Sequence, residues 1–325
     1  MFRAALLLTL LLATPALARD PILSLPLDCT LGQDCFILNY VDSDPSEGAA
    51  DFTCGPRSYD GHKGTDFAVT SFAAMEAGVT VLPAAPGVVT ALRDGMPDTG
   101  LSDGFDATLD GRECGNGLVI DHGGGWETQY CHLKNGSLAV KKGQRVSLAT
   151  PLGDVGYSGR TEFPHVHLAV RKNGQIVDPF NTDDILSCGE DDGPDDDLWR
   201  DLTPYDSGLI IGLGMADAVP DFELLKAGGY RDEAFAPNAP ALVGWVLIAG
   251  GRTGDTVEIE ILFPDRRRLI KDEQTLTRTQ AMLFRASGKR IPNSGWPVGE
   301  YVIAARLLRD GLPISFDNTR ITVAE

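Results

Sequence analysis

The chain has 325 residues, enough for about two domains of ordinary size. Hydrophobic residues make up 43% and charged residues 23%, as in ordinary soluble globular proteins. The formal net charge of −18 argues against nucleic acid or an anionic membrane as a partner. The 37 glycines and 20 prolines favour a turn-rich, mainly β chain over a helical one.

The N-terminal segment predicts a secretory signal peptide over residues 1–18. Arg3 supplies a short positive region, an apolar run follows from Ala4 to Ala13, and Ala16-Leu17-Ala18 is an A-x-A cleavage site. The apolar run is too short to span a bilayer, and no later stretch is long enough, so we expect no membrane anchor. The alternative is a buried N-terminal helix. The mature protein is expected to start near Arg19 and to be periplasmic or secreted.

The segments that follow differ in composition. Residues 19–60 form an irregular segment with three cysteines, and residues 61–187 contain short, strand-sized apolar runs broken by glycine. Turn signals such as Asn173-Gly174 separate these runs. Residues 188–204 are acidic and contain glycine and proline, which favours a solvated linker over a calcium site.

Residues 205–325 predict a second, smaller domain with an Ig-like β-sandwich fold. In "DTVEIEILFPD" the apolar residues from Val257 to Phe263 alternate with polar ones, which is the period of a half-buried strand. Further strands are expected in "ALVGWVLIAG", "GEYVIAARLLRDG" and "NTRITV". We expect Trp245, Trp296 and Tyr301 in its core. The segment has no histidine, so we expect attachment to a partner rather than catalysis.

Six cysteines in an exported chain predict disulfides rather than a zinc–cysteine site, because no C-x-x-C pair is present. Counting outward from a glycine turn near Gly123–Gly125 places Cys131 opposite the start of the preceding strand, close to Cys114. The sequence therefore predicts a Cys114–Cys131 disulfide. The remaining expected pairs are Cys29–Cys35 and Cys54–Cys188.

All five histidines lie before residue 168, and four of them fall into three groups. His165 and His167 are two apart in a predicted strand, so both imidazoles face the same way. His62 and Asp66 are four apart, and His132 ends a predicted hairpin strand. Imidazole and carboxylate are normal zinc ligands, so the groups predict a metal site.

A catalytic zinc uses three protein ligands and leaves one position open. Four histidines and one aspartate exceed that number, so two of the five residues are expected to act as acid–base or electrostatic groups. No H-E-x-x-H motif is present, which excludes the helix-borne metalloprotease site. From the residues alone, the choice of ligands stays open.

Residues of about 55–180 resemble the lysostaphin- and LytM-type zinc endopeptidases that cut peptidoglycan. The resemblance covers H-x-G-x-D at His62-Lys63-Gly64-Thr65-Asp66, "AGVTVLPAAPGVV", "GNGLVIDHGGGWETQYCHL" and H-x-H at His165-Val166-His167. It implies an antiparallel β-sheet domain. It also implies zinc ligands at His62, Asp66 and His167, and catalytic histidines at His132 and His165. His122 matches a position in the hairpin with no chemical role.

The resemblance implies an exported zinc endopeptidase that acts on peptidoglycan cross-links or stem peptides. The alternative is a catalytically silent relative that binds and activates other cell-wall hydrolases, but such relatives typically lose ligands and this chain keeps all five positions. A structural β protein would leave the clustered histidines unexplained. The chain departs from the family in a longer acidic insert from Asp94 to Cys114, in Leu168, where the family often has Phe, and in its cysteines. The bond that is cut is not implied.

Overall fold

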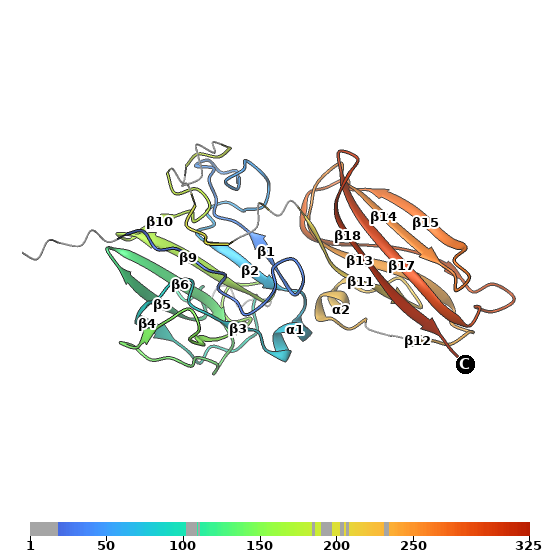
Figure 1. Ribbon diagram of the computed structural model, residues 1–325, viewed down its shortest axis with the longest axis horizontal. Coiled ribbons are helices and arrows are strands. Elements are labelled where there is room, and N and C mark those ends of the chain that lie inside the picture. Colours follow the sequence, from blue (N-terminus) through green and yellow to red (C-terminus); the bar gives the residue numbers. More distant parts are fainter. Residues whose placement is uncertain are drawn as a thin grey trace, which may run out of the picture.

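The structure is a computed structural model that describes residues 19–101, 109, 111–183, 186–189, 197–201, 205, 208–230 and 234–325. The predicted signal peptide and most of the predicted acidic linker lie outside these residues. Two strand-rich parts lie side by side (Figure 1). The prediction of a mainly β protein is confirmed. Within the described part of the chain, no helix is long and apolar enough to cross a membrane.

The first part is built on an antiparallel sheet with the strand order β1-β2-β9-β6-β5-β4-β7, and β10 pairs with β9. Its strands are β1 (Cys35–Asn39), β2 (Thr65–Val69), β4 (Gly87–Arg93), β5 (Asn116–Gly123), β6 (Trp126–Leu133), β7 (Arg145–Val146), β9 (His165–Lys172) and β10 (Gln175–Val177). β3 (Thr80–Val81) pairs with β8 (Gly153–Asp154), and the short helix α1 (Phe72–Ala77) follows β2.

Two hairpins bring the central strands together. Gly124 and Gly125 connect β5 to β6 with positive φ angles of 61° and 84°, which glycine adopts without steric cost. Asn173 and Gly174 connect β9 to β10 with φ angles of 52° and 80°, as a two-residue hairpin turn requires. Both turns are where the sequence predicts them, so the strands on either side run antiparallel.

The N-terminal segment is less irregular than the sequence predicts. Its strand β1 pairs with β2 along the edge of the sheet, and Leu23 and Leu27 belong to the main hydrophobic core. Sequence periodicity missed β1 because its residues are buried on both faces and show no alternation. The three predicted disulfides are confirmed: Cys29–Cys35, Cys54–Cys188 and Cys114–Cys131.

The described end of the predicted linker also packs against the protein. The N–H of Leu23 donates to the carbonyl of Leu198 at 2.7 Å, and the Leu198 side chain is only 8% exposed. The Trp199 ring contacts Phe67 with a centroid distance of 5.8 Å. Leu198 and Trp199 therefore pack on the core, whereas Asp197, Arg200 and Asp201 are exposed. That residues 188–204 form a linker stays a prediction.

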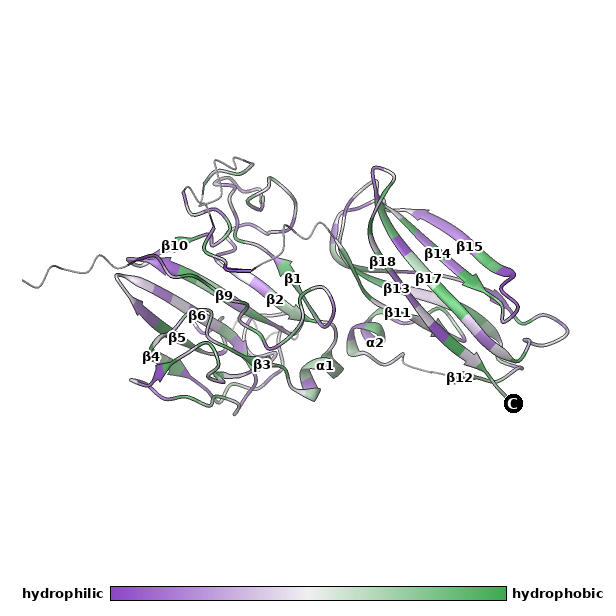
Figure 2. Ribbon diagram, viewed as in Figure 1, coloured by the Kyte–Doolittle hydropathy of each residue, from purple (hydrophilic) through white to green (hydrophobic). Residues whose placement is uncertain are grey.

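The second part consists of two facing sheets, ordered β11-β13-β16 and β12-β18-β17-β14-β15. Side chains such as Val246 and Ile248 of one sheet pack against Val257 and Ile259 of the other, so the core lies between the sheets. Apolar and polar residues alternate along β14, as the sequence predicts (Figure 2). Along β17, buried and partly buried positions alternate from Tyr301 to Leu308. The strands are β11 (Leu209–Ala216), β12 (Ala234–Phe235), β13 (Ala241–Gly251), β14 (Thr256–Leu262), β15 (Arg268–Thr275), β16 (Gln280–Arg290), β17 (Gly299–Arg309) and β18 (Leu312–Val323), and helix α2 is Phe222–Ala227.

The predicted core residues of this part are buried: Trp245 is 7% exposed, Trp296 3% and Tyr301 0%. The outer face of the three-stranded sheet contacts the first part of the protein. Phe36 and Phe163 lie in one buried cluster with Ala249, and Ile211 and Met282 pack against that cluster. That residues 205–325 fold as an independent domain stays a prediction.

Candidate active site

Three adjacent strands, β2, β9 and β6, carry four of the five predicted site residues. Asp66 on β2 pairs with His167 on β9, and Cys131 on β6 pairs with the same histidine from the other side. His165 begins β9, His132 is the penultimate residue of β6, and His62 lies in the turn before β2. The sheet therefore brings all five predicted residues to one place.

His62, Asp66 and His167 form a compact group of possible metal ligands. The Oδ1 atom of Asp66 lies 3.1 Å from Nε2 of His62 and 2.9 Å from Nδ1 of His167. Those two ring nitrogens lie 3.1 Å apart. Two imidazole nitrogens and one carboxylate oxygen that face a common point are a normal donor set for zinc.

Burial and charge define the protonation of this group. Burial opposes ionisation of Asp66, but the neighbouring His62 and His165 imidazoles hold the pKa of its carboxyl well below the usual value. Burial also lowers the pKa of His167 below its ordinary value. The ionised carboxylate of Asp66 and the neutral imidazole of His167 are forms that bind a metal. At His62, burial opposes the charged form, but the neighbouring Asp66 charge outweighs it and raises the pKa of that imidazole.

His132 and His165 are oriented by carbonyl groups. Nδ1 of His132 lies 2.8 Å from the carbonyl oxygen of Ser158, and Nδ1 of His165 lies 2.8 Å from that of Phe163. Because a carbonyl only accepts, each Nδ1 carries the proton of the neutral ring. Nε2 of His165 then faces Oδ1 of Asp66 at 3.4 Å. Burial, together with the adjacent His165 and His167, lowers the pKa of His132 well below its usual value, so its imidazole is neutral.

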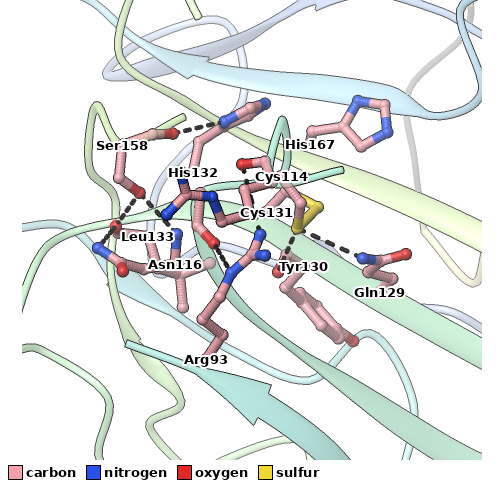
Figure 3. The surroundings of a disulfide bond; sticks show 12 residues. Arg93, Cys114, Asn116, Gln129, Tyr130, Cys131, His132, Leu133, Ser158 and His167 are labelled. Carbon is pink, nitrogen blue, oxygen red and sulfur yellow. Dashed lines mark hydrogen bonds between the residues drawn. A yellow bond between two sulfur atoms is a disulfide. The ribbon is translucent and has the colours of Figure 1, made fainter. Parts of the chain in front are cut away.

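A buried polar network supports His132 (Figure 3). Its backbone has a positive φ of 65°, and its N–H donates to the carbonyl of Cys114 at 2.8 Å. The Ser158 hydroxyl donates to Leu133 at 2.7 Å and accepts from the N–H of Asn116 at 2.9 Å. Since non-glycine residues rarely adopt a positive φ, these contacts hold an unfavourable backbone conformation in place.

His122 lies apart from this group, as predicted. Its Nδ1 contacts the carbonyl of Pro86 and its Nε2 contacts the hydroxyl of Thr128, both at 2.8 Å.

The described ends of the acidic insert contact residues next to the site. The N–H of Leu101 donates to the carbonyl of Thr161, and Met96 exchanges two hydrogen bonds with the Asn116 side chain. The described ends of the insert therefore lie against the segment that positions the histidines.

Sequence analysis missed the residues that orient the predicted ones. Asn39 contacts Asp66, the carbonyl of Tyr40 contacts His62, and Ser158 and Thr161 contact His132 and His165. Two of these contacts use backbone carbonyls, which leave no mark on residue identity. The "YSGRT" stretch before H-x-H contains Ser158 and Thr161, and its small polar residues were the only available signal.

Comparison with known proteins places the site in a defined part of the chain. The model of peptidase family M23 matches residues 60–179. The peptidoglycan DD-endopeptidase ShyA of Vibrio cholerae is 34% identical over 116 residues, which are 36% of this chain and 21% of ShyA. The DD-carboxypeptidase/endopeptidase Mpg of Neisseria meningitidis is 38% identical over 100 residues, which are 29% of this chain and 22% of Mpg.

The aligned region spans about a fifth of the length of these curated relatives. Among solved structures, a zinc-containing peptidase from Vibrio cholerae is 26% identical, with a TM-score of 0.28, over 45% of this chain and 39% of that chain. The catalytic domain of the prophage-encoded M23 protein EnpA from Enterococcus faecalis is 25% identical, with a TM-score of 0.30, over 44% and 95%. At such low TM-scores these structural likenesses carry no functional argument.

Proposed function

Since residues 60–179 form a peptidase family M23 domain of the LytM type, we propose that the protein is an exported zinc endopeptidase that hydrolyses peptide cross-links or stem peptides of bacterial peptidoglycan. The observation that carries this proposal is the convergence of His62, Asp66 and His167 beside two further histidines. The names of ShyA and Mpg support the substrate class.

The chemistry of the donor set fits zinc. Ligand atoms of His62, Asp66 and His167 lie within 4.8 Å of one another, and His62 offers Nε2 because its Nδ1 donates to a carbonyl. These three residues would hold the ion. When bound, zinc supplies positive charge that polarises a peptide carbonyl and makes a nearby water easier to deprotonate.

The two remaining histidines supply the proton chemistry. Neutral His132 has a free Nε2 lone pair, which can accept a proton from the attacking water and later return it to the leaving amine. The His165 ring lies 4.7 Å from the His132 ring, and its Nε2 lies 3.4 Å from Oδ1 of Asp66. Nε2 of His165 can accept a proton from the water and so orient it, and the protonated ring can then donate to the developing oxyanion. An imidazole thus takes the part that glutamate has in H-E-x-x-H enzymes.

The alternative, a silent relative that only binds other wall hydrolases, is less well supported. A silent relative has no need to keep a complete ligand set, whereas this chain retains all five side chains in mutual contact. Export to the periplasm or outside the cell belongs to the same proposal, on the basis of the signal-like N-terminus and the disulfides. Residues 205–325 are proposed to contact the cell wall or a protein partner.

The test combines metal analysis with digestion of defined muropeptides and product identification by mass spectrometry. The mature protein is expected to contain about one zinc per chain and to release the products of peptide-bond cleavage. His62→Ala and Asp66→Ala are expected to lose both zinc and cleavage, while the control His122→Ala keeps both. Full zinc occupancy in both ligand variants would refute the ligand assignment. A zinc-loaded protein that leaves every cross-linked muropeptide intact would refute the enzymatic proposal and favour the silent alternative.

A further inference from the structure

We propose that Asn39 is a positioning residue for the metal site and that the N-terminal segment therefore forms part of that site. The inference rests on the proposed function, because it concerns how the zinc ligand Asp66 is held. Asn39 lies outside residues 60–179, the region that matches the family. It ends strand β1, which begins at the disulfide-bonded Cys35.

The two oxygens of Asp66 have different partners. Oδ1 faces His62 and His167, whereas Oδ2 accepts a hydrogen bond from Nδ2 of Asn39 at 3.1 Å. An ionised carboxylate only accepts, so the amide must present its NH₂ group. The hydrogen bond stops the carboxylate from rotating and determines which oxygen is directed at the metal.

The next residue holds a second ligand. The carbonyl of Tyr40 accepts from Nδ1 of His62 at 2.6 Å, which fixes the ring orientation and leaves Nε2 to face Asp66. Two consecutive residues thus orient two of the three proposed ligands. Contacts of this kind fix the tautomer and direction of a metal ligand, and their loss weakens metal binding.

The strand geometry explains why these residues reach the site. The β1–β2 register shifts between Ile37 and Asn39, so Ile37 pairs with Phe67 while Asn39 pairs with Asp66. Such an irregularity bends a strand and re-aims its side chains. It places Asn39 beside the ligand-bearing residue of β2.

The test compares the zinc affinity of three variants with that of the unaltered protein. Asn39→Leu keeps the approximate shape but removes the donor, and Asn39→Ser has a hydroxyl too short to keep the same contact. Ile37→Val is the matched control, because it trims a buried side chain on the same strand without touching a ligand. Zinc dissociation constants come from competition with a chromophoric chelator. Visible spectra of the cobalt-substituted proteins report the ligand geometry, which a purely structural role of Asn39 would leave unchanged.

Both Asn39 variants are expected to bind zinc about 10- to 100-fold more weakly and to show altered cobalt spectra, while Ile37→Val matches the unaltered protein. Unchanged zinc affinity and spectra in the folded Asn39 variants would overturn the inference and leave the proposed function standing. An equal loss of zinc affinity in Ile37→Val would overturn the inference too, since a general loosening of β1 would then explain the weaker zinc binding. Absence of zinc binding by the unaltered protein would overturn both this inference and the proposed metal site.

Discussion

The two histidines of H-x-H share one face of β9 but differ in what each ring nitrogen contacts. Nδ1 of His165 faces a carbonyl, whereas Nδ1 of His167 faces Asp66. The His167 ring also packs closely against Gly64, where a Cβ atom would lie 2.6 Å from Nε2 of His167. Strand periodicity alone makes the two residues equivalent. In the fold, Nδ1 of His167 belongs to the group of possible metal ligands, whereas Nε2 of His165 lies 3.4 Å from Oδ1 of Asp66.

At the residue scale, we expect His132→Ala and His165→Ala to keep zinc and to lose about 100-fold or more in turnover. The reason is that neither residue belongs to the group of three facing donor atoms, while both offer Nε2 beside it. Zinc content and the kcat for a soluble muropeptide are the measurements. His122→Ala serves as the control. Near-normal turnover in either variant would remove that residue from the mechanism.

Asp178 gives a pH-dependent prediction. The residue is fully buried, and burial together with the nearby Asp51 raises its pKa to about 7. Its Oδ1 accepts from the N–H of Phe180, and its Oδ2 has no partner among the described residues. The folded protein therefore binds a proton that the unfolded chain releases near pH 4. The stabilisation from this group is complete below about pH 4 and is lost as the pH rises towards 7.

Asp178→Asn keeps an acceptor for Phe180 and removes the ionisation. When the pH is raised from 5 to 8, the unfolding free energy of the metal-free, unaltered protein should fall by about 1–3 kcal/mol more than that of metal-free Asp178→Asn. Urea unfolding at both pH values measures the difference. Asp60→Asn, at an exposed position, is the control. The same pH dependence in the unaltered protein and Asp178→Asn would show that the carboxyl ionises normally in the fold.

At the element scale, the strands that carry the site differ in how far the sequence predicts them. β5 and β6 flank a glycine turn, so their pairing and the Cys114–Cys131 disulfide follow from counting residues. β1 has no comparable signal. Its pairing with β2 joins residues far apart in the chain and includes a register shift, so the Asn39–Asp66 contact could not be derived from local pattern.

The Cys114–Cys131 disulfide gives a prediction at the same scale. Cys131 directly precedes His132, and the Cys114 carbonyl accepts the His132 N–H (Figure 3). We expect Cys114→Ser/Cys131→Ser to lower turnover more than it lowers zinc content, because the positive φ of His132 loses its support. The chain-entropy model also gives a stability loss of about 3 kcal/mol for a loop of this length.

Kinetics and thermal unfolding of that double variant are the measurements, with Cys29→Ser/Cys35→Ser as the comparison. The comparison variant removes the disulfide at the start of β1. Its two cysteines have a sequence separation of 6, compared with 17 for Cys114 and Cys131. It should affect zinc binding through Asn39 and Tyr40 rather than turnover of the zinc-loaded protein. If both double variants had the same turnover per bound zinc, the proposed support of His132 would be refuted.

At the scale of the whole molecule, the two parts meet through apolar and polar contacts. Phe36 and Leu38 of β1 lie in the buried cluster that includes Ala249 of β13. The Tyr205 hydroxyl donates to Asp51 and accepts from Arg252, both at 2.7 Å. Composition and periodicity predict the two strand-rich parts separately, but this contact depends on surfaces that only the folded sheets create. Since β1 also carries Asn39, the contact connects the second part to the proposed metal site through one strand.

A shortened chain that ends after Tyr205 and keeps Cys188 tests this connection. The family match ends at residue 179, so we expect the shortened protein to bind zinc and to cleave small soluble muropeptides. We also expect a lower melting temperature, because removal of β11, β13 and β16 exposes Phe36, Leu38 and Phe163, which are at most 9% exposed in the full chain. Calorimetry and muropeptide digestion measure the two effects, and residues 208–325 alone, which should bind no zinc, are the control. A folded, zinc-loaded shortened protein without activity would show that the second part contributes to catalysis. An unchanged melting temperature would show that the contact between the two parts does not stabilise β1.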